Sequence, residues 1–249
     1  MIAIITGATG DIGEEFVKTL LGEVDSIWAV GRSKNKLDLL KEKYGEKILP
    51  VVCDLSDQDS IINLCNRIDE EKPSIKYLVN NAGVARMAPV TKFEFQEING
   101  MLDLNAKAAT LLCRAAIPYM PKGSYILNIA SASAFQPNPY IALYSASKAY
   151  LLSFTRSLNV ENEDINCIAV CPGWVDTKML PGKDQNGKDI KYPGMCTSEQ
   201  VVSSALKDVR KGKDVSVCSF YYRYMRFLSK VLPHRTCMKY WMRAIKQYI

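Results

Sequence analysis

The sequence has a single histidine, His234, among 249 residues. This scarcity argues against a histidine-based metal site and against a Ser-His-Asp triad, because both need imidazole groups. The eight cysteines are scattered through mostly apolar segments, so we interpret them as buried free thiols and not as a disulfide framework. Cys167 and Cys171 are spaced like half of a metal site but have no second ligand pair. We therefore expect no bound metal.

Long apolar runs are also missing, and none approaches the length that spans a membrane. The first residues show neither a basic segment nor a cleavage-site pattern, so we expect no secretion signal and a cytoplasmic protein. No internal repeat, low-complexity stretch or linker is present. At this length the chain can form one large α/β domain with a substantial core, and we expect a single domain.

Short β-branched runs alternate with amphipathic segments along the chain. The expected strands are residues 2–6, 26–30, 48–53, 77–80, 125–130, 165–170 and 215–220, and the expected helices are about 11–21, 34–44, 57–71, 95–119, 142–162 and 198–211. This alternation predicts a parallel sheet of about seven strands with helices on both faces, which is a doubly wound α/β fold. One long irregular segment, 174–197, collects glycine and proline, and such a loop is usually functional or mobile.

A glycine-rich stretch, "TGATGDIG" at 6–13, lies between the first expected strand and the first expected helix. Glycines there let the backbone approach a pyrophosphate, which the helix N-terminus then stabilises. The stretch predicts a nucleotide site, and an ordinary tight turn is the alternative. The residues expected to contact the cofactor are Gly7, Thr9, Gly10, Asp11, Ile12 and Gly13. The Asp11 carboxylate complicates this interpretation because it would lie close to anionic groups.

The second expected strand ends in Gly31 and Arg32, where a carboxylate would bind the ribose hydroxyl of NAD. Arginine instead suits a 2′-phosphate, so NADP(H) is favoured and NAD(H) is the alternative. The plain alternative is a solvated arginine at a strand end. Asp54, after the third strand, would accept a hydrogen bond from the adenine amino group or would simply begin a turn. Ser33 and Leu55 complete the residues expected at this end of the cofactor.

The stretch "YSASK" places Tyr144 and Lys148 four residues apart with only small residues between them. On a helix these positions share one face. The pair is either a proton-transfer device or a surface tyrosine beside a surface lysine, and the two residues alone do not decide.

Seven motifs in order carry a resemblance to a known family: "TGATGDIG" (6–13), "CDL" (53–55), "NNAG" (80–83), "LN" (104–105), "LNIAS" (127–131), "YSASK" (144–148) and "PGWVDT" (172–177). Over about residues 1–220 the chain resembles the compact, single-domain short-chain dehydrogenases/reductases, which have a Rossmann fold. One departure is the position of Gly10 and Asp11, since the spacing TGxxGxxG resembles longer, epimerase-type members of the family. A nucleotide-sugar epimerase is therefore one alternative, and a non-catalytic dinucleotide-binding sensor is another.

The resemblance implies hydride transfer between a nicotinamide cofactor and a carbonyl or alcohol substrate. Tyr144 would be the general acid/base, Lys148 would bind the nicotinamide ribose, Ser131 would polarise the carbonyl, and Asn105 would complete a proton relay. Further cofactor contacts are implied for Asn81, Ala82, Gly83, Tyr144, Lys148, Pro172, Gly173, Val175 and Thr177. Family members are commonly dimers or tetramers through their two long helices, here about 95–119 and 142–162.

Electrostatics offers a reason for the Tyr144–Lys148 spacing. A free phenol has a pKa near ~10 and is poorly matched to proton transfer at neutral pH. A lysine about 4.5 Å away, at an effective dielectric of ~20, favours the phenolate by roughly 3.7 kcal/mol. We therefore expect Lys148 to lower the pKa of Tyr144.

The loop after Thr177 is expected to line the substrate site with apolar side chains, namely Met179, Leu180, Tyr192, Pro193 and Met195. This composition favours a hydrophobic ketone or alcohol, steroid-like or lipid-like. Residues 221–249 form a basic, aromatic extension that we expect to be two helical pieces interrupted near Pro233. It either packs over the substrate entrance or a subunit interface, or lies on an anionic membrane surface. We expect no nucleic-acid partner.

Overall fold

A computed structural model describes the chain except for residues 179, 181–189 and 246–249. In the described residues seven strands form one sheet in the order β3-β2-β1-β4-β5-β6-β7, and all neighbours are parallel. The strands are β1 (Ile2–Thr6), β2 (Ser26–Gly31), β3 (Ile48–Val52), β4 (Ile75–Asn80), β5 (Ser124–Ile129), β6 (Ile165–Val170) and β7 (Val215–Ser216). The predicted seven-stranded Rossmann fold is confirmed.

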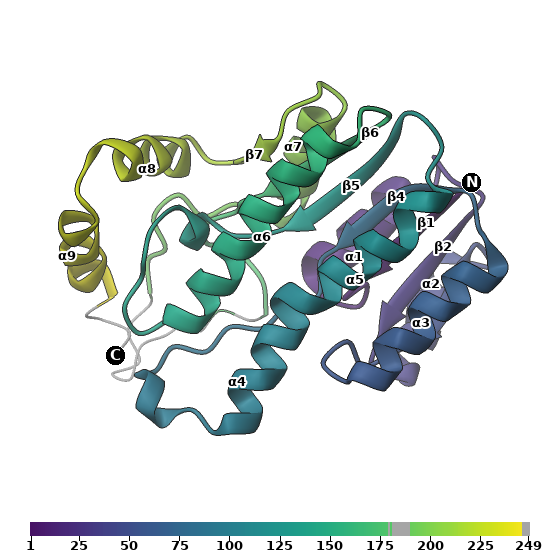
Figure 1. The fold of residues 1–249 in the computed structure, drawn as a ribbon, viewed down its shortest axis with the longest axis horizontal. Coiled ribbons are helices and arrows are strands. Elements are labelled where there is room, and N and C mark those ends of the chain that lie inside the picture. The colour runs from purple at the N-terminus through teal and green to yellow at the C-terminus, as the bar shows by residue number, and fades with distance from the viewer. Residues whose placement is uncertain (179, 181–189, 246–249) are drawn as a thin grey trace.

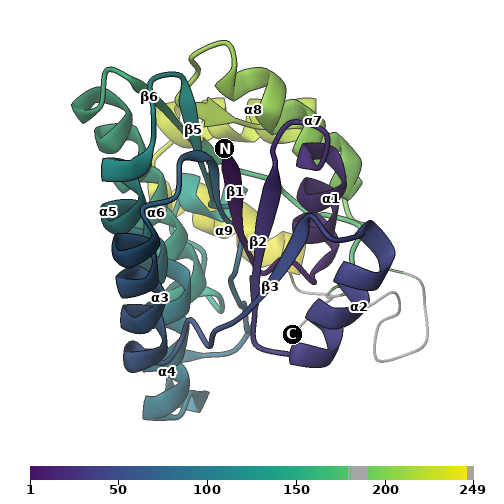
Figure 2. The same ribbon diagram turned by 90° about the vertical axis from the view of Figure 1, so that its right-hand side faces the viewer.

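Helices cover both faces of the sheet, as Figures 1 and 2 show. On one face lie α1 (Asp11–Leu20), α2 (Lys34–Tyr44) and α7 (Ser198–Val209), which pack on a core that includes Phe16, Leu37 and Val201. On the other lie α3 (Gln58–Glu71), α5 (Ala108–Ala116) and α6 (Ala142–Glu161), whose core includes Leu64, Leu112 and Leu158. Because the strands are covered on both faces, they consist largely of buried apolar residues.

Two expected elements differ from those observed. The seventh strand is two residues long and not six, because the chain leaves the sheet after Ser216 and begins α8 (Phe220–Val231). The expected helix over 95–119 is interrupted: α4 (Phe95–Leu102) passes through a π-helical turn at Asp103–Lys107 into α5. The α-helix then ends in a 3₁₀ turn at Ile117–Tyr119. This turn contains Pro118, which has no N–H with which to continue the α-helical hydrogen bonds.

The parallel arrangement brings the carboxyl ends of all the strands to one edge of the sheet. The residues that follow β1, β2, β4, β5 and β6 therefore meet at this edge, where ligands of open α/β sheets bind. The glycine turn follows β1, Arg32 follows β2, and Ser131 comes two residues after the end of β5. Segments from five parts of the sequence thus converge on one site.

The C-terminal extension forms α8 and α9 (His234–Ile245), with Pro233 between them as expected. Both helices contact loops at the carboxyl edge of the sheet. Tyr222 of α8 lies against the backbone of Gly173, and the Trp241 indole of α9 donates a hydrogen bond to the Pro139 carbonyl at 2.8 Å. No helix in the described part of the chain combines the length and apolar character needed to cross a membrane.

Candidate active site

The glycine turn is shaped by its own backbone contacts. Gly7 has φ +61°, in the left-handed region that favours glycine, and its carbonyl accepts a hydrogen bond from the Gly10 N–H at 3.0 Å. A Cβ on Gly13 would lie 2.1 Å from the Gly7 oxygen, so only glycine lets α1 begin this close to the turn. The result is a bare backbone surface in front of the α1 N-terminus, which is the cradle that a pyrophosphate requires. The residues therefore fit a dinucleotide.

Thr6, which is not among the predicted site residues, holds this turn in place. The Thr6 hydroxyl accepts hydrogen bonds from the N–H groups of Asn81 and Ala82 at 2.9 and 3.1 Å. The Asn81 amide in return donates to the carbonyl oxygens of Thr6 and Gly7, both at 3.1 Å. The structure thus shows the Asn81 side chain supporting the turn. Its predicted direct contact with the cofactor stays a prediction.

Asp11 joins the glycine turn to the loop that follows β6. Its carboxylate accepts a hydrogen bond from the backbone N–H of Lys178 at 3.0 Å, although 167 positions separate the two residues. Lys178 is also close enough to Glu14, in the first turn of α1, to help lower the pKa of that carboxyl, after the larger effect of a hydrogen bond from Lys43. This hydrogen bond therefore holds the start of the loop after Thr177 against the N-terminus of α1, the helix that would bind the pyrophosphate.

We expect Asp11→Asn to strengthen coenzyme binding by about threefold to tenfold, because it removes an anion beside the pyrophosphate site. The asparagine oxygen can still accept a hydrogen bond from the Lys178 N–H, so the contact between α1 and the loop is kept. Glu15→Gln is the matched control, since it removes one carboxylate from the same helix at an ion pair with Lys18. Titration of NADPH fluorescence measures the affinities. Equal changes in the two variants would contradict a specific effect of Asp11.

The predicted adenosine-binding residues lie together at the ends of β2 and β3. Arg32 is exposed, and it adds to the lowering of the Asp54 pKa, after the larger effect of a hydrogen bond from Ser56. The Ser33 hydroxyl accepts the Lys36 N–H at 3.4 Å and so caps α2. Asp54 also makes the turn that we considered as its alternative role, since it accepts from the N–H and hydroxyl of Ser56 at 2.9 and 2.6 Å. An exposed guanidinium therefore stands at this end of the site.

Tyr144, Lys148 and Ser131 converge beside the ends of β5 and β6. Lys148 is 3% exposed, and its Nζ donates to the Ile129 carbonyl at 2.7 Å and lies 5.7 Å from the centre of the Tyr144 ring. Ser131 lies close enough to the Tyr144 side chain to oppose the effect of burial on its pKa. Ser131 also accepts the Ser133 N–H at 3.1 Å, so it caps the short turn after β5 as well. The pair is thus not a surface tyrosine beside a surface lysine.

The direction of the Tyr144 pKa shift differs from our expectation. Burial raises the pKa of Tyr144, and the nearby Ser131 side chain opposes this only in part. Burial also lowers the pKa of Lys148 to about 8. Desolvation, which the Coulomb argument left out, therefore sets the direction of both shifts.

Asn105 lies in the π-helical turn and is 1% exposed. Its amide exchanges two hydrogen bonds with the Val84 backbone, each 2.9 Å long, and donates a third to the Ser147 hydroxyl at 3.2 Å. A Cβ on Gly83 would lie 3.2 Å from both Asn105 Oδ1 and Lys148 Nζ. Asn105 and Lys148 therefore both approach Gly83, where a larger residue would crowd them, and the relay role of Asn105 stays a prediction. π-Helical turns are frequent at functional sites.

The segment after β6 carries the remaining predicted residues. The Pro172 carbonyl accepts the Ala132 N–H at 2.8 Å, and Val175 forms an isolated bridge with Cys196. A Cβ on Gly173 would lie 1.7 Å from the Tyr222 ring, so only glycine lets α8 pack against the loop that follows β6. The Thr177 carbonyl accepts the Leu180 N–H at 3.1 Å, whereas Met179 lies outside the described residues. Sequence reasoning did not identify Tyr222 as part of this region.

Comparisons with known proteins agree with this geometry. The sequence model of the family described as short chain dehydrogenase matches residues 1–188. The chain is 30% identical to the very-long-chain 3-oxoacyl-CoA reductase of Anas platyrhynchos, over 98% of this chain and 80% of that protein.

Solved structures show the same fold. A short-chain dehydrogenase from Sphingobium yanoikuyae in complex with NADPH superposes with a TM-score of 0.78 at 24% identity, covering 96% of this chain and 95% of that one. The bulky-bulky ketone specific alcohol dehydrogenase from Comamonas testosteroni gives a TM-score of 0.76 at 24% identity, covering 96% and 93%. The match over most of the chain and the sheet order together show that the protein belongs to the short-chain dehydrogenase/reductase family of NAD(P)-dependent oxidoreductases.

Proposed function

We propose that the protein is an NADP-dependent oxidoreductase that reduces the carbonyl of a hydrophobic substrate, or oxidises the corresponding alcohol. The observation that carries this proposal is the grouping of Ser131, Tyr144 and a 3%-exposed Lys148 at the carboxyl edge of the sheet, beside the bare glycine turn. A sensor without turnover would not need a buried lysine beside a tyrosine and a serine.

Each residue of the group has a separate task in the proposed mechanism. The glycine turn and the α1 N-terminus would hold the pyrophosphate, Lys148 the nicotinamide ribose, and Arg32 the 2′-phosphate. The bound cofactor supplies or accepts the hydride. The Ser131 hydroxyl donates to the substrate carbonyl and polarises it, while Tyr144 delivers a proton to the developing alkoxide.

The shifted pKa values bear on the direction of the reaction. Burial raises the pKa of Tyr144, so the phenol is protonated at neutral pH, which is the form that a reduction needs. Oxidation needs the phenolate, which becomes available as the pH rises. The residues therefore favour reduction near neutral pH. In this proposal Asn105, which approaches Lys148 at Gly83, would position the relay that returns a proton to Tyr144 by way of Lys148.

The preference for NADP rests on Arg32, and we expect NADPH to raise the melting temperature more than NADH at equal concentration. Arg32→Glu should remove the difference, because it replaces a phosphate-binding fork with an anion. Arg114→Glu is the matched control, an exposed arginine near the C-terminal end of α5 and so far from the carboxyl edge. A larger shift with NADH in the unmodified protein would contradict the proposed role of Arg32.

The proposed substrate class rests on the residues after Thr177. Leu180, Tyr192, Pro193 and Met195 belong to this loop, and the rings of Trp174 and Tyr192 lie 5.0 Å apart. A panel of ketones, followed by NADPH absorbance, tests the whole proposal. Turnover that rises with the apolar size of the ketone supports it, and the absence of turnover with every ketone would leave only a dinucleotide-binding protein.

We further propose that residues 221–249 are an extension of the same cytoplasmic domain and that the protein forms homo-oligomers. The contacts of Tyr222 and Trp241 with loops at the carboxyl edge support the first point. The exposed apolar side chains Phe95 and Tyr150, on α4 and α6, support an interface through the two long helical segments.

A further inference from the structure

The outer face of α8 carries a line of exposed apolar side chains. Phe220, Tyr224, Phe227 and Val231 are 82%, 53%, 60% and 59% exposed. They are spaced four, three and four residues apart, which places all of them on one side of the helix. We call this set the aromatic stripe. Soluble monomers rarely expose such a row of large apolar groups without a binding role.

The opposite face of α8 is anchored to the protein, so the stripe is presented on a fixed helix. Tyr222 packs against Gly173 and its hydroxyl accepts the Trp174 N–H at 3.4 Å. Arg223 donates to the Val217 carbonyl at 2.9 Å, and Ser229 is buried. Met225 and Leu228 are half-buried, whereas Tyr224 is more than half exposed.

The charge around the stripe has one sign. From Val215 to Ile249 the sequence contains seven lysines and arginines and no aspartate or glutamate. Among the described residues, none of the salt bridges involves a side chain of α8 or α9. At 3.6 residues per turn, Arg223 and Lys230 lie along one flank of the stripe.

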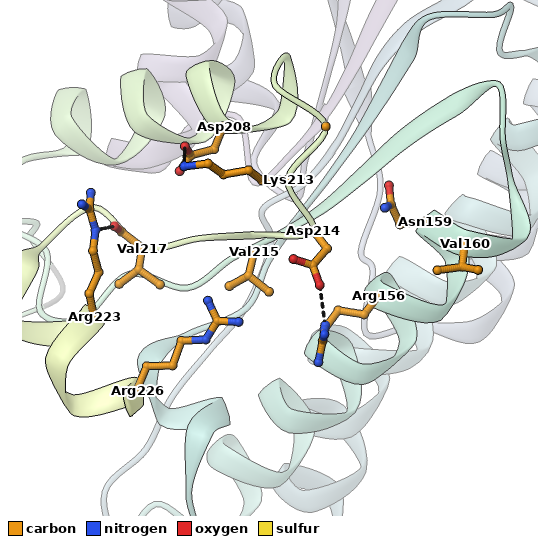
Figure 3. Close-up of a pocket in the computed structure, with 11 residues that line it drawn as sticks. Arg156, Asn159, Val160, Asp208, Lys213, Asp214, Val215, Val217, Arg223 and Arg226 are labelled. Atoms are coloured by element: carbon orange, nitrogen blue, oxygen red, sulfur yellow. Dashed lines mark hydrogen bonds and ion pairs between the residues drawn. The ribbon is translucent and has the colours of Figure 1, made fainter. Parts of the chain in front are cut away.

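A hollow of about 590 Å³ lies beside this flank, between α6, β7 and α8 (Figure 3). In it Arg156 is paired with Asp214 at 2.7 Å and Lys213 with Asp208 at 2.6 Å. Arg223 and Arg226 line the same hollow, and no carboxylate there forms a salt bridge with either of them. The flank of α8 therefore carries net positive charge next to the apolar stripe.

We propose that α8 docks this protein on an anionic lipid bilayer, with the aromatic stripe in the interface and the neighbouring cations on the headgroups. An apolar row with cations beside it is the arrangement of helices that lie in the plane of a membrane surface. A second copy of the chain fits the stripe less well, because it would bring an equally basic α8 and α9 without acids to pair with them. This inference is independent of the substrate and of the coenzyme preference.

Co-sedimentation of the full-length chain with vesicles tests the proposal. We expect binding to vesicles of phosphatidylcholine mixed with phosphatidylserine and little binding to phosphatidylcholine alone, and the binding should weaken as salt is added. Phe227→Glu should weaken binding by about tenfold or more, because it places a charge in the stripe. Lys230→Gln should weaken it by about fivefold, and this change leaves both the stripe and the Arg223 anchor intact.

Leu39→Glu is the matched control, because Leu39 on α2 is 61% exposed and the charge change is the same. It should bind vesicles like the unmodified protein, and unchanged thermal unfolding of Phe227→Glu would show that the fold is intact. The proposal is overturned if neither lipid mixture binds the protein, or if Leu39→Glu loses as much binding as Phe227→Glu. It is also overturned if Phe227→Glu abolishes a dimer that forms without vesicles, since the stripe would then bind a second copy.

Discussion

Replacing Tyr144 with phenylalanine is expected to lower the turnover number for ketone reduction by about 10²- to 10⁴-fold, the range that a positioned general acid contributes. The substitution removes one hydroxyl and keeps the ring that lies near Lys148 Nζ. NADPH binding should change little, because the glycine turn and Lys148 remain. Initial rates with a ketone that the unmodified protein reduces measure the turnover number, and thermal shifts on adding NADPH measure coenzyme binding.

The matched control is Tyr150→Phe, which makes the same chemical change on the same helix. Tyr150 is exposed, and its hydroxyl is 3.0 Å from that of Thr110. This variant should retain the turnover of the unmodified protein. If Tyr144→Phe also retained turnover to within about threefold, proton delivery by Tyr144 would be ruled out, and the site would have to use water or another side chain.

Much of the architecture was predictable from periodicity alone. Strands such as 2–6 and 165–170 are short runs rich in β-branched residues, and the structure reproduces these two ranges unchanged. The convergence of the glycine turn, Ser131 and Tyr144 on one edge then follows from parallel topology. The seventh strand was predicted too long because Val215 and Val217 alternate with Ser216 as they would in a strand, and apolar residues continue to Phe220. The competing helix start at Phe220 could not be weighed without its contacts.

Features that depend on contacts between distant segments were not accessible from the sequence. The hydrogen bond between the Asp11 carboxylate and the Lys178 N–H joins two distant positions, and neither residue type predicts the other as its partner. The packing of Tyr222 on Gly173 is of the same kind. The π-helical turn at Asn105 has no periodic signature either. The Tyr144 pKa was predicted in the wrong direction because spacing gives the distance to Lys148 but not the depth of burial.

Lys148→Met is expected to make the protein more stable while it removes most of the activity. The ordinary lysine pKa of 10.5 falls to about 8 in the folded protein, because burial disfavours the charged form. That difference corresponds to about 3 kcal/mol of destabilisation at pH 7. Methionine avoids this cost but leaves the Ile129 carbonyl without its 2.7 Å partner, which costs about 1 kcal/mol. A net gain of about 2 kcal/mol in the free energy of unfolding corresponds to a melting temperature about 4–8 °C higher.

The pH dependence separates this effect from a general gain in packing. Because the folded pKa of Lys148 is lowered, the unfolded chain binds more protons between pH 8 and 10.5, and the stability of the unmodified protein rises through that window. The advantage of Lys148→Met is therefore complete below about pH 8 and disappears as the pH approaches 10.5. Lys76→Met is the control, since half-buried Lys76 donates to the Gly123 carbonyl at 2.8 Å, and its loss should not stabilise the protein. If Lys148→Met is less stable than the unmodified protein at pH 7, the ammonium must be well solvated or paired in the folded protein. Lys148 would then not be the desolvated cation of the proposed ribose contact and proton relay.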